Sequence, residues 1–419
     1  LIAQGLVRPM EQGYGFAHDR VREAARLLTP IQDRPLQHAR AARLMLLRRA
    51  ADSPDQLLRV AGLILKAVRD EGVGALRGGV RLRFAESLRR AADLATSSGS
   101  LDQAATYLDA ADALVRGSWW RDHPALIVAI KQGQAASLMA RGKISDAEEN
   151  LATLLSQDLT VLSRAETYRL MAVLRTVQSD YEGAIAAALA GLELLGHRLE
   201  RGPSESACLE AAERIRAVMG DRPDADFARR PLSDSPATAL ATSLLSTLIV
   251  TTFSGDRLLF THLAKVVELT LADGITSNSA YGLAWYGVMI AHFHDRHEDG
   301  FAYVQAALEL VERHGFEGQR TTALLAMDQL SPWIKPFGYA LERVYDAIAA
   351  AKAAGDLAMS CYARNHLVSD LIQMGRPLAD VEKDARRGIA FARRFGFRDI
   401  EILIEAQHGF VRRMQLGYE

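Results

Sequence analysis

Apolar and polar positions follow a helical period along most of the chain, and the apolar stretches end at evenly spaced glycines. Gly274, Gly315, Gly355 and Gly396 lie 41, 40 and 41 residues apart, and each closes one such stretch. An interval of about 40 residues fits one hairpin of two helices. Because so short a hairpin cannot bury its apolar stripe alone, such units stack on their neighbours. The pattern predicts an all-α solenoid of helical hairpins, with each glycine at the left-handed position after a helix.

Small residues recur in the N-terminal half where paired helices are expected to cross. Segments 99–104, 142–147 and 179–184 each lie between two helical stretches and end in alanine, at intervals of 43 and 37 residues. Another alanine stands 12 residues before each of these. The arrangement resembles the tetratricopeptide repeat (TPR), which needs a small residue at the crossing, because overpacking there costs about 1–3 kcal/mol. The residues concerned are Ala92, Ala135, Ala172, Ala104, Ala147 and Ala184.

The N-terminal segment carries a second family resemblance. A strand or turn around Tyr14 and Phe16 precedes a helix that we expect from about Asp19, with Asp19 as its N-cap. The stretch 14–25, with its His-Asp-Arg-Val block, resembles the winged-helix end of a signalling ATPase of the AAA/STAND type. That ATPase occurs in large proteins that also contain a Ser/Thr kinase-like domain, a helical arm and a sensor histidine kinase. Further similarity to the arm lies at Trp120 and in segments 194–199, 279–287 and 300–303.

The resemblance and the composition together predict five segments. The N-terminal one is the end of the winged helix with the helix that follows, and a helical linker comes next. Two sets of TPR-like hairpins follow, separated by a proline-rich loop or hinge. The predicted limits are residues 1–51, 52–80, 81–220, 221–236 and 237–419.

The resemblance also implies a role for His18. In related ATPases the histidine of a matching His-Asp pair reaches the bound diphosphate, and an imidazole N–H can donate to a phosphate oxygen. His18 would then contact ATP or ADP only together with an ATPase core outside this segment. The alternative is that His18 is a polar residue preceding a helix cap.

Composition and charge limit the partners and the compartment. The chain has 419 residues, 49% hydrophobic and 24% charged, with a net charge of −1. These values exclude long disorder and predict no field for nucleic acid. Cys208 and Cys361 have no CxxC partner, which favours reduced thiols and a cytoplasmic location. The longest apolar run, 238–253, is too short to span a membrane, and the start at Leu1 suggests a piece of a longer protein.

No motif for catalysis or for a bound cofactor occurs in the sequence. It has no GxxxxGK[ST] phosphate loop, GxSxG elbow, HExxH pair or phosphoacceptor-histidine box. His292, His294 and His297 invite a metal hypothesis, but their spacing indicates a polar turn between helices. We therefore expect no catalytic residue, no metal and no cofactor in this segment, and expect ATP or ADP in the parent protein.

An aromatic stripe is the candidate ligand groove. Tyr281, Trp285, Met289 and His292 recur at helical spacing on the first helix of a hairpin, which lines the inner groove in such repeats. They could hold a peptide or small apolar ligand, or they could be packing between hairpins. Trp333, bracketed by prolines, is open to the same two interpretations.

The leading functional hypothesis is a regulatory arm without catalysis of its own. It would bind a protein, a peptide or the parent's own modules, and pass that state to ATPase and kinase modules of a two-component signalling protein. The alternative is the arm of a transcription regulator, in which a DNA-binding helix-turn-helix follows. A third class, an independent helical enzyme, lacks any clustered acid, base or metal signature.

Overall fold

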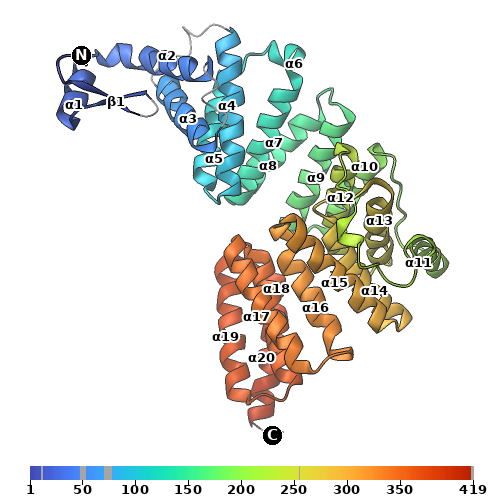
Figure 1. The fold of residues 1–419 in the computed structure, drawn as a ribbon. Coiled ribbons are helices and arrows are strands. Elements are labelled where there is room, and N and C mark those ends of the chain that lie inside the picture. The colour runs from blue at the N-terminus through green and yellow to red at the C-terminus, as the bar shows by residue number, and fades with distance from the viewer. Residues whose placement is uncertain (11–12, 48–52, 70–77, 254, 417–419) are drawn as a thin grey trace. The chain divides into compact units, whose positions relative to one another are not determined.

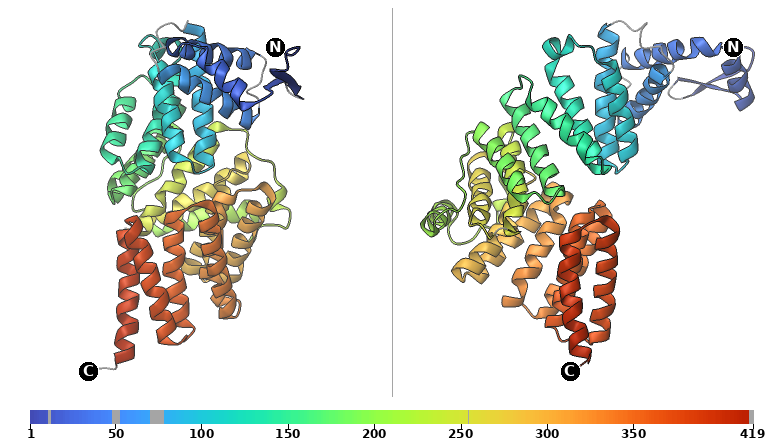
Figure 2. Two further views of the ribbon diagram at one scale, coloured as in Figure 1. Left: turned by 90° about the vertical axis from the view of Figure 1, so that its left-hand side faces the viewer. Right: turned by 180° about the vertical axis from the view of Figure 1, so that it is seen from behind.

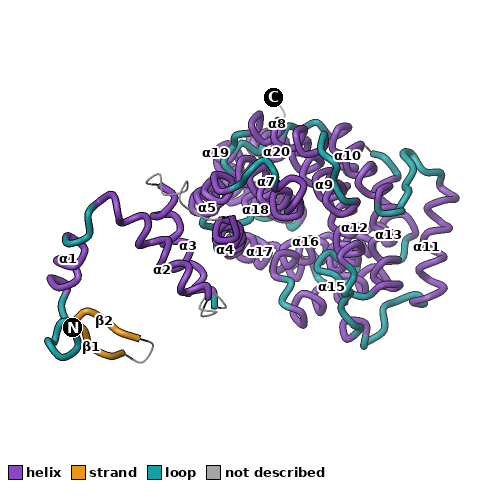
Figure 3. Tube along the Cα trace, turned by 90° about the horizontal axis from the view of Figure 1, so that it is seen from above, coloured by secondary structure: helices purple, strands orange, loops and turns teal. Residues whose placement is uncertain are grey.

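The computed structural model describes residues 1–10, 13–47, 53–69, 78–253 and 255–416. In this part of the chain the regular structure is helical, apart from one N-terminal β-hairpin and one isolated bridge between Leu232 and Ile275. Figure 3 shows the hairpin in orange and the helices in purple. The chain forms two compact units, Leu1–Leu159 and Thr160–Glu419.

The first unit opens with the predicted strand and helix. Strands β1 (Val7–Met10) and β2 (Gly13–Phe16) pair antiparallel, and α1 (Asp19–Leu27) follows. The predicted cap at Asp19 is wrong by one residue, because the carbonyl of His18 accepts the first helical bond, from the N–H of Arg22 at 3.2 Å. Asp19 instead lies in the first turn, 3.0 Å from the Arg22 guanidinium.

Helical hairpins make up the rest of the first unit. Its buried core includes Phe84 and Leu88, which lie in residues 78–97, and Ile127, which lies in residues 124–140. The helices are α2 (Arg34–Leu47), α3 (Pro54–Arg69), α4 (Gly78–Ser97), α5 (Leu101–Leu114), α6 (Trp119–Asp122), α7 (Pro124–Ala140) and α8 (Ile144–Leu155).

The second unit continues the hairpins over a longer stretch. Figure 1 labels its helices, and Figure 2 shows the C-terminal ones, in orange and red, as antiparallel rods side by side. They are α9 (Val161–Val177), α10 (Tyr181–Leu194), α11 (Glu205–Met219), α12 (Pro236–Thr247), α13 (Leu258–Asp273), α14 (Ser279–His294), α15 (His297–His314), α16 (Arg320–Leu330), α17 (Phe337–Ala354), α18 (Leu357–Gln373), α19 (Leu378–Phe395) and α20 (Arg398–Leu416).

Side-chain caps begin several of these helices. A Ser, Thr or Asp oxygen accepts a bond from a backbone N–H three residues later, which satisfies one of the free donors of the first turn. The caps are Thr160, Asp180, Ser204, Ser235 and Asp356.

Three of the four spaced glycines have the predicted left-handed conformation. Gly315, Gly355 and Gly396 end α15, α17 and α19 with φ of 69°, 67° and 78°. Gly274 differs, with φ 99° and ψ 175°. It needs glycine for a second reason, because a Cβ there would lie 2.8 Å from the carbonyl oxygen of Pro231.

The alanines predicted at helix crossings are all buried. Each is at most 1% exposed, which confirms the TPR-like packing of these hairpins. The residues are Ala92, Ala104, Ala135, Ala147, Ala172 and Ala184.

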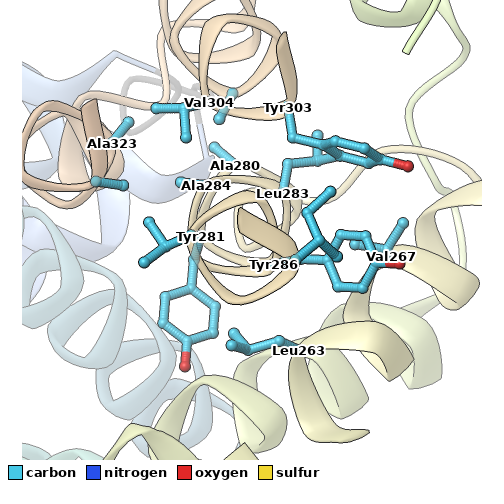
Figure 4. Packing of buried hydrophobic residues seen from close by; sticks show 14 of the residues in the cluster. Leu263, Val267, Ala280, Tyr281, Leu283, Ala284, Tyr286, Tyr303, Val304 and Ala323 are labelled. Atoms are coloured by element: carbon cyan, nitrogen blue, oxygen red, sulfur yellow. The ribbon is translucent and has the colours of Figure 1, made fainter. Parts of the chain in front are cut away.

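Two glycines allow a close backbone approach between α14 and α15. A Cβ on Gly287 would stand 2.5 Å from the Gly300 carbonyl oxygen, and one on Gly300 would stand 2.4 Å from that of Gly287. Tyr303 on α15 packs edge-on to Tyr286, with ring centroids 5.2 Å apart. Figure 4 shows this cluster around α14.

The segment predicted as a loop or hinge is anchored to the second unit. Phe227 and Ala228 are buried in the same core as α14 and α15. The ring of His314 lies 2.8 Å from the Ala228 carbonyl oxygen, and the N–H of Ile275 donates to Pro231 at 2.9 Å. These contacts hold the segment in place, and the predicted domain limits stay a prediction.

The structure confirms the predicted fold class, an all-α, TPR-like array of helical hairpins that follows a small strand-and-helix segment. None of the described helices combines the length and the apolar character that crossing a lipid bilayer requires.

Candidate functional site

His18 lies on the exposed end of the N-terminal segment. Its carbonyl caps α1 by accepting the N–H groups of Val21 and Arg22. The backbone of His18 thus has a structural role, and its contact with a nucleotide diphosphate stays a prediction.

Tyr281 belongs to the core and not to an open groove. It is 5% exposed, and its hydroxyl lies 2.9 Å from Nε2 of His262. Nδ1 of His262 lies 3.0 Å from the carbonyl of Leu258, so that nitrogen carries the proton and Nε2 accepts from Tyr281. Burial lowers the pKa of His262 to about 4 and raises that of Tyr281 above its usual value, so both stay neutral.

The other three residues of the predicted stripe form its accessible part. Trp285 and Met289 are half-buried against the core around α14, and His292 is exposed. Figure 4 shows Tyr281 and Tyr286 leaving α14 in different directions. The stripe is thus core at Tyr281 and surface at His292.

The three histidines around residue 295 lie at a turn between helices. Asp295 ends α14 in the left-handed conformation with φ 54°, and Nδ1 of His297 lies 3.3 Å from its carboxylate. Within the described ranges, no group of three or more His, Cys, Asp or Glu side chains is arranged to hold a metal ion.

A polar pocket that the sequence did not point out opens between α16 and α18. Its volume is about 410 Å³, which falls in the range of sites that take small molecules or peptide side chains. Its lining is Asp328, Gln329, Pro332, Trp333, Phe337, Asn365, His366, Ser369, Asp370 and Gln373.

Asp328 and His366 form an oriented pair in this pocket. Nδ1 of His366 lies 2.7 Å from Oδ2 of Asp328, which is only 3% exposed. With the proton on Nδ1, the other ring nitrogen is an acceptor and faces the side-chain amide of Gln329 at 3.5 Å. The carboxylate therefore sets both the tautomer and the direction of the imidazole.

Asp370 places a second buried carboxyl against the first. Asp370 is 6% exposed. Its Oδ2 atom has no hydrogen-bond donor nearby, and the same is true of Oδ1 of Asp328. Burial, followed by the nearby charge of Asp328, raises the pKa of Asp370 to about 8. A proton on Asp370 therefore lets it donate to Asp328 near neutral pH.

Helix α20 fixes the polar wall of the pocket. The side-chain amide of Gln407 donates to Oδ1 of Asn365 at 3.0 Å and to the hydroxyl of Ser369 at 2.8 Å. Trp333 also lines the pocket, is 71% exposed, and has its ring centroid 4.7 Å from that of His297. The lining of this pocket thus combines two buried acids, amide and hydroxyl side chains and an exposed indole.

A second pocket, of about 490 Å³, lies between residues 196–203, α11 and α13. Three of its charges are paired with one another, since Glu268 accepts from Arg214 at 2.8 Å and from Lys265 at 3.3 Å. That pairing leaves it without a clear preference for a charged ligand.

Sequence analysis noted Trp333 but missed the acids. The signal was present, because Asp328 and Asp370 are 42 residues apart, about one repeat. The two acids therefore occupy the same position on the first helices of two neighbouring hairpins, where apolar residues are expected. Such a repeat indicates that the two polar side chains contact each other.

Comparison with known proteins gives structural likenesses at low sequence identity. The chain matches no protein-family model and no curated protein. It is similar to a signal-transduction ATPase of the STAND class with a TPR sensor from Pyrococcus horikoshii, at a TM-score of 0.48 and 16% identity over 98% of this chain. The chain spans 57% of the length of that protein. It is also similar to the apo form of RapI, with a TM-score of 0.43 and 12% identity, over 91% of this chain and 99% of that one.

Proposed function

We propose that the chain is a regulatory, protein-interaction arm of a signalling ATPase. It would bind a protein or peptide partner and couple that binding to nucleotide-hydrolysing and kinase modules outside this segment. Its own role would be binding without catalysis or a cofactor, while ATP or ADP is bound elsewhere in the parent. The resemblance of segment 14–25 to the end of such an ATPase supports this placement.

The main observation in support of this proposal is the polar pocket, which lies on a surface formed by successive helical hairpins. Helix α16 packs on α14 and on α18, and α18 packs on α20, so first helices of neighbouring hairpins lie side by side. A solenoid of this kind presents an extended surface to a partner. The polar pocket between α16 and α18 gives that surface a place of chemical specificity.

The physical basis of regulation is reciprocal coupling. A partner that prefers one state of the arm shifts the population toward that state. By linkage, the arm's hold on its ATPase changes by the same free energy as the partner's affinity. A binding surface without its own reaction is sufficient for this role.

Photo-crosslinking from the pocket tests the binding role. The full-length protein is produced in cells with p-benzoylphenylalanine at position 333, and a matched control carries it at position 309, an exposed site on α15. We expect a discrete crosslinked product from position 333 alone, whose second member mass spectrometry identifies as another module of the protein or as a partner. Equal or absent products from the two positions would overturn the proposal.

A further inference from the structure

We propose that the pocket between α16 and α18 binds the guanidinium group of an arginine side chain on a protein partner, between the carboxylates of Asp328 and Asp370 and the indole of Trp333. This inference deepens the proposed function and rests on it for the nature of the partner. It names the ligand chemistry at that surface.

The first argument is the pair of free carboxyl oxygens. Oδ1 of Asp328 and Oδ2 of Asp370 belong to residues more than nine-tenths buried, and they have no donor among their neighbours. A guanidinium offers five N–H donors in a planar fork, which suits two acceptors side by side. It would replace the proton that otherwise lies between the two carboxyls.

The second argument is the charge of the lining. Asp328, His366 and Asp370 are the titratable residues that face the pocket from α16 and α18, and the remaining lining residues are neutral. No lysine or arginine lines the pocket to neutralise the acids. An incoming cation therefore meets uncompensated negative charge.

The third argument is the exposed aromatic ring. Trp333 lines the pocket with 71% of its surface exposed, although an indole of this size is ordinarily buried to a large extent. Guanidinium groups stack on indole faces and are attracted by them, more than ammonium groups of similar size. The Asn365 and Ser369 side chains that Gln407 holds add neutral polar contacts at the rim.

A metal ion fits the same residues less well. His366 turns Nδ1 toward Asp328 instead of a shared centre, and the described residues hold no metal-type group. An organic cation with several donors matches separate acceptors better than a point charge does.

The test uses fluorine NMR of the chain with its four tryptophans replaced by 5-fluorotryptophan. The Trp333→Phe variant assigns the Trp333 signal, and the other three tryptophans report on sites outside the pocket. The protein is titrated with acetyl-arginine amide, and separately with acetyl-citrulline amide, which has the same shape without the charge. We expect the arginine derivative to move the Trp333 signal in a saturable way and the citrulline derivative to leave it in place.

Two variants locate the contact. Asp370→Asn should weaken arginine binding by about tenfold or more, since it removes a charge-assisted acceptor. Glu309→Gln, which removes an exposed charge on α15, should leave binding unchanged. In the wild-type chain binding should tighten from pH 6 to pH 8, by at most about tenfold per pH unit, because the Asp370 proton must leave.

The outcomes separate this inference from the proposed function. Equal responses to arginine and citrulline, or no saturable response of Trp333, would overturn the arginine site, and both ligands are compared on the wild-type sequence. If the arginine titration fails in this way but a crosslink forms from position 333, the proposed interaction arm is supported and its ligand is not arginine. Arginine binding without any crosslink would instead contradict the proposed protein-interaction role.

Discussion

Asp370 shows how far the fold alters the chemistry of a single residue. An aspartate ordinarily has a pKa of 3.8, and the value here is about 8 because the carboxyl is buried beside Asp328. The native state therefore holds a proton that the unfolded chain releases above about pH 4. Stability falls wherever the native state binds more protons than the unfolded state, here between about pH 4 and pH 8.

The Asp370→Asn variant tests this linkage. Near pH 4 the carboxyl is protonated in the native state and largely protonated in the unfolded state, so we expect similar free energies of unfolding for the two proteins. As the pH rises to 8, the wild type should lose stability relative to the variant by up to about 1.4 kcal/mol per pH unit. Urea unfolding at several pH values measures the difference, and parallel curves would contradict the buried acid pair.

Gly287 gives a second prediction at the residue scale. Its replacement by alanine places a Cβ 2.5 Å from the Gly300 carbonyl oxygen, so α14 and α15 must separate. We expect Gly287→Ala to cost about 2 kcal/mol or more of unfolding free energy. Gly409→Ala is the matched control, because Gly409 is also inside a helix but has nothing within 4 Å of an added Cβ. That change should be neutral or stabilise by up to about 1 kcal/mol, and equal losses would refute the close-contact argument.

At the element scale, helix positions could be predicted well and the reasons for their ends only in part. The periodic stretches that were predicted to end at Gly315, Gly355 and Gly396 follow from local patterns, and α15, α17 and α19 end there. Gly274 shows the limit. Its spacing matches the other three glycines, but its conformation depends on segment 231–233, which is distant in sequence. No local signal reports such a contact.

The energetic weight of this distant contact can be measured by comparing two glycines that end helices. Gly355→Ala places a Cβ in open space at φ 67°, so we expect a cost of about 1 kcal/mol from backbone strain. Gly274→Ala adds a clash with the Pro231 carbonyl at 2.8 Å and should cost clearly more. Thermal or urea unfolding of the two variants decides, and an equal loss would mean that the Pro231 contact has no energetic weight.

At the scale of the whole molecule, the chain forms two compact units, and the predicted domain limits stay a prediction. The second unit starts at Thr160, and the predicted boundary at 221–236 falls inside it. The three core clusters that lie in residues 160–419 contain no residue from the first unit. The proline-rich composition of 221–236 indicates a loop correctly, but the burial of Phe227 depends on α15 and could not be read from composition.

The separate cores predict that residues 160–419 fold alone. A fragment of this range should show helical circular dichroism and a cooperative unfolding transition, since its cores are complete. A fragment of residues 221–419 is the control. It lacks α9, α10 and α11, and part of the core around α12 with them, so it should be less stable or aggregate. Non-cooperative unfolding of the longer fragment would contradict the division at residue 160.

The sequence predicted the aromatic stripe as a candidate site but did not predict the polar pocket. The aromatic stripe was visible because helical spacing is local, but it led to Tyr281, which the structure places in the core. The pocket depends on Asp328, His366 and Asp370, which come together only when α16 packs on α18. The packing of neighbouring hairpins, and not the motif content of either, creates the site.

The most direct test of the proposed regulatory role compares nucleotide hydrolysis by the proposed parent ATPase with and without residues 160–419. If the arm controls modules outside this chain, its removal should change the hydrolysis rate and the linked autophosphorylation, while Glu309→Gln should change neither. Identical rates with and without the arm would contradict the account.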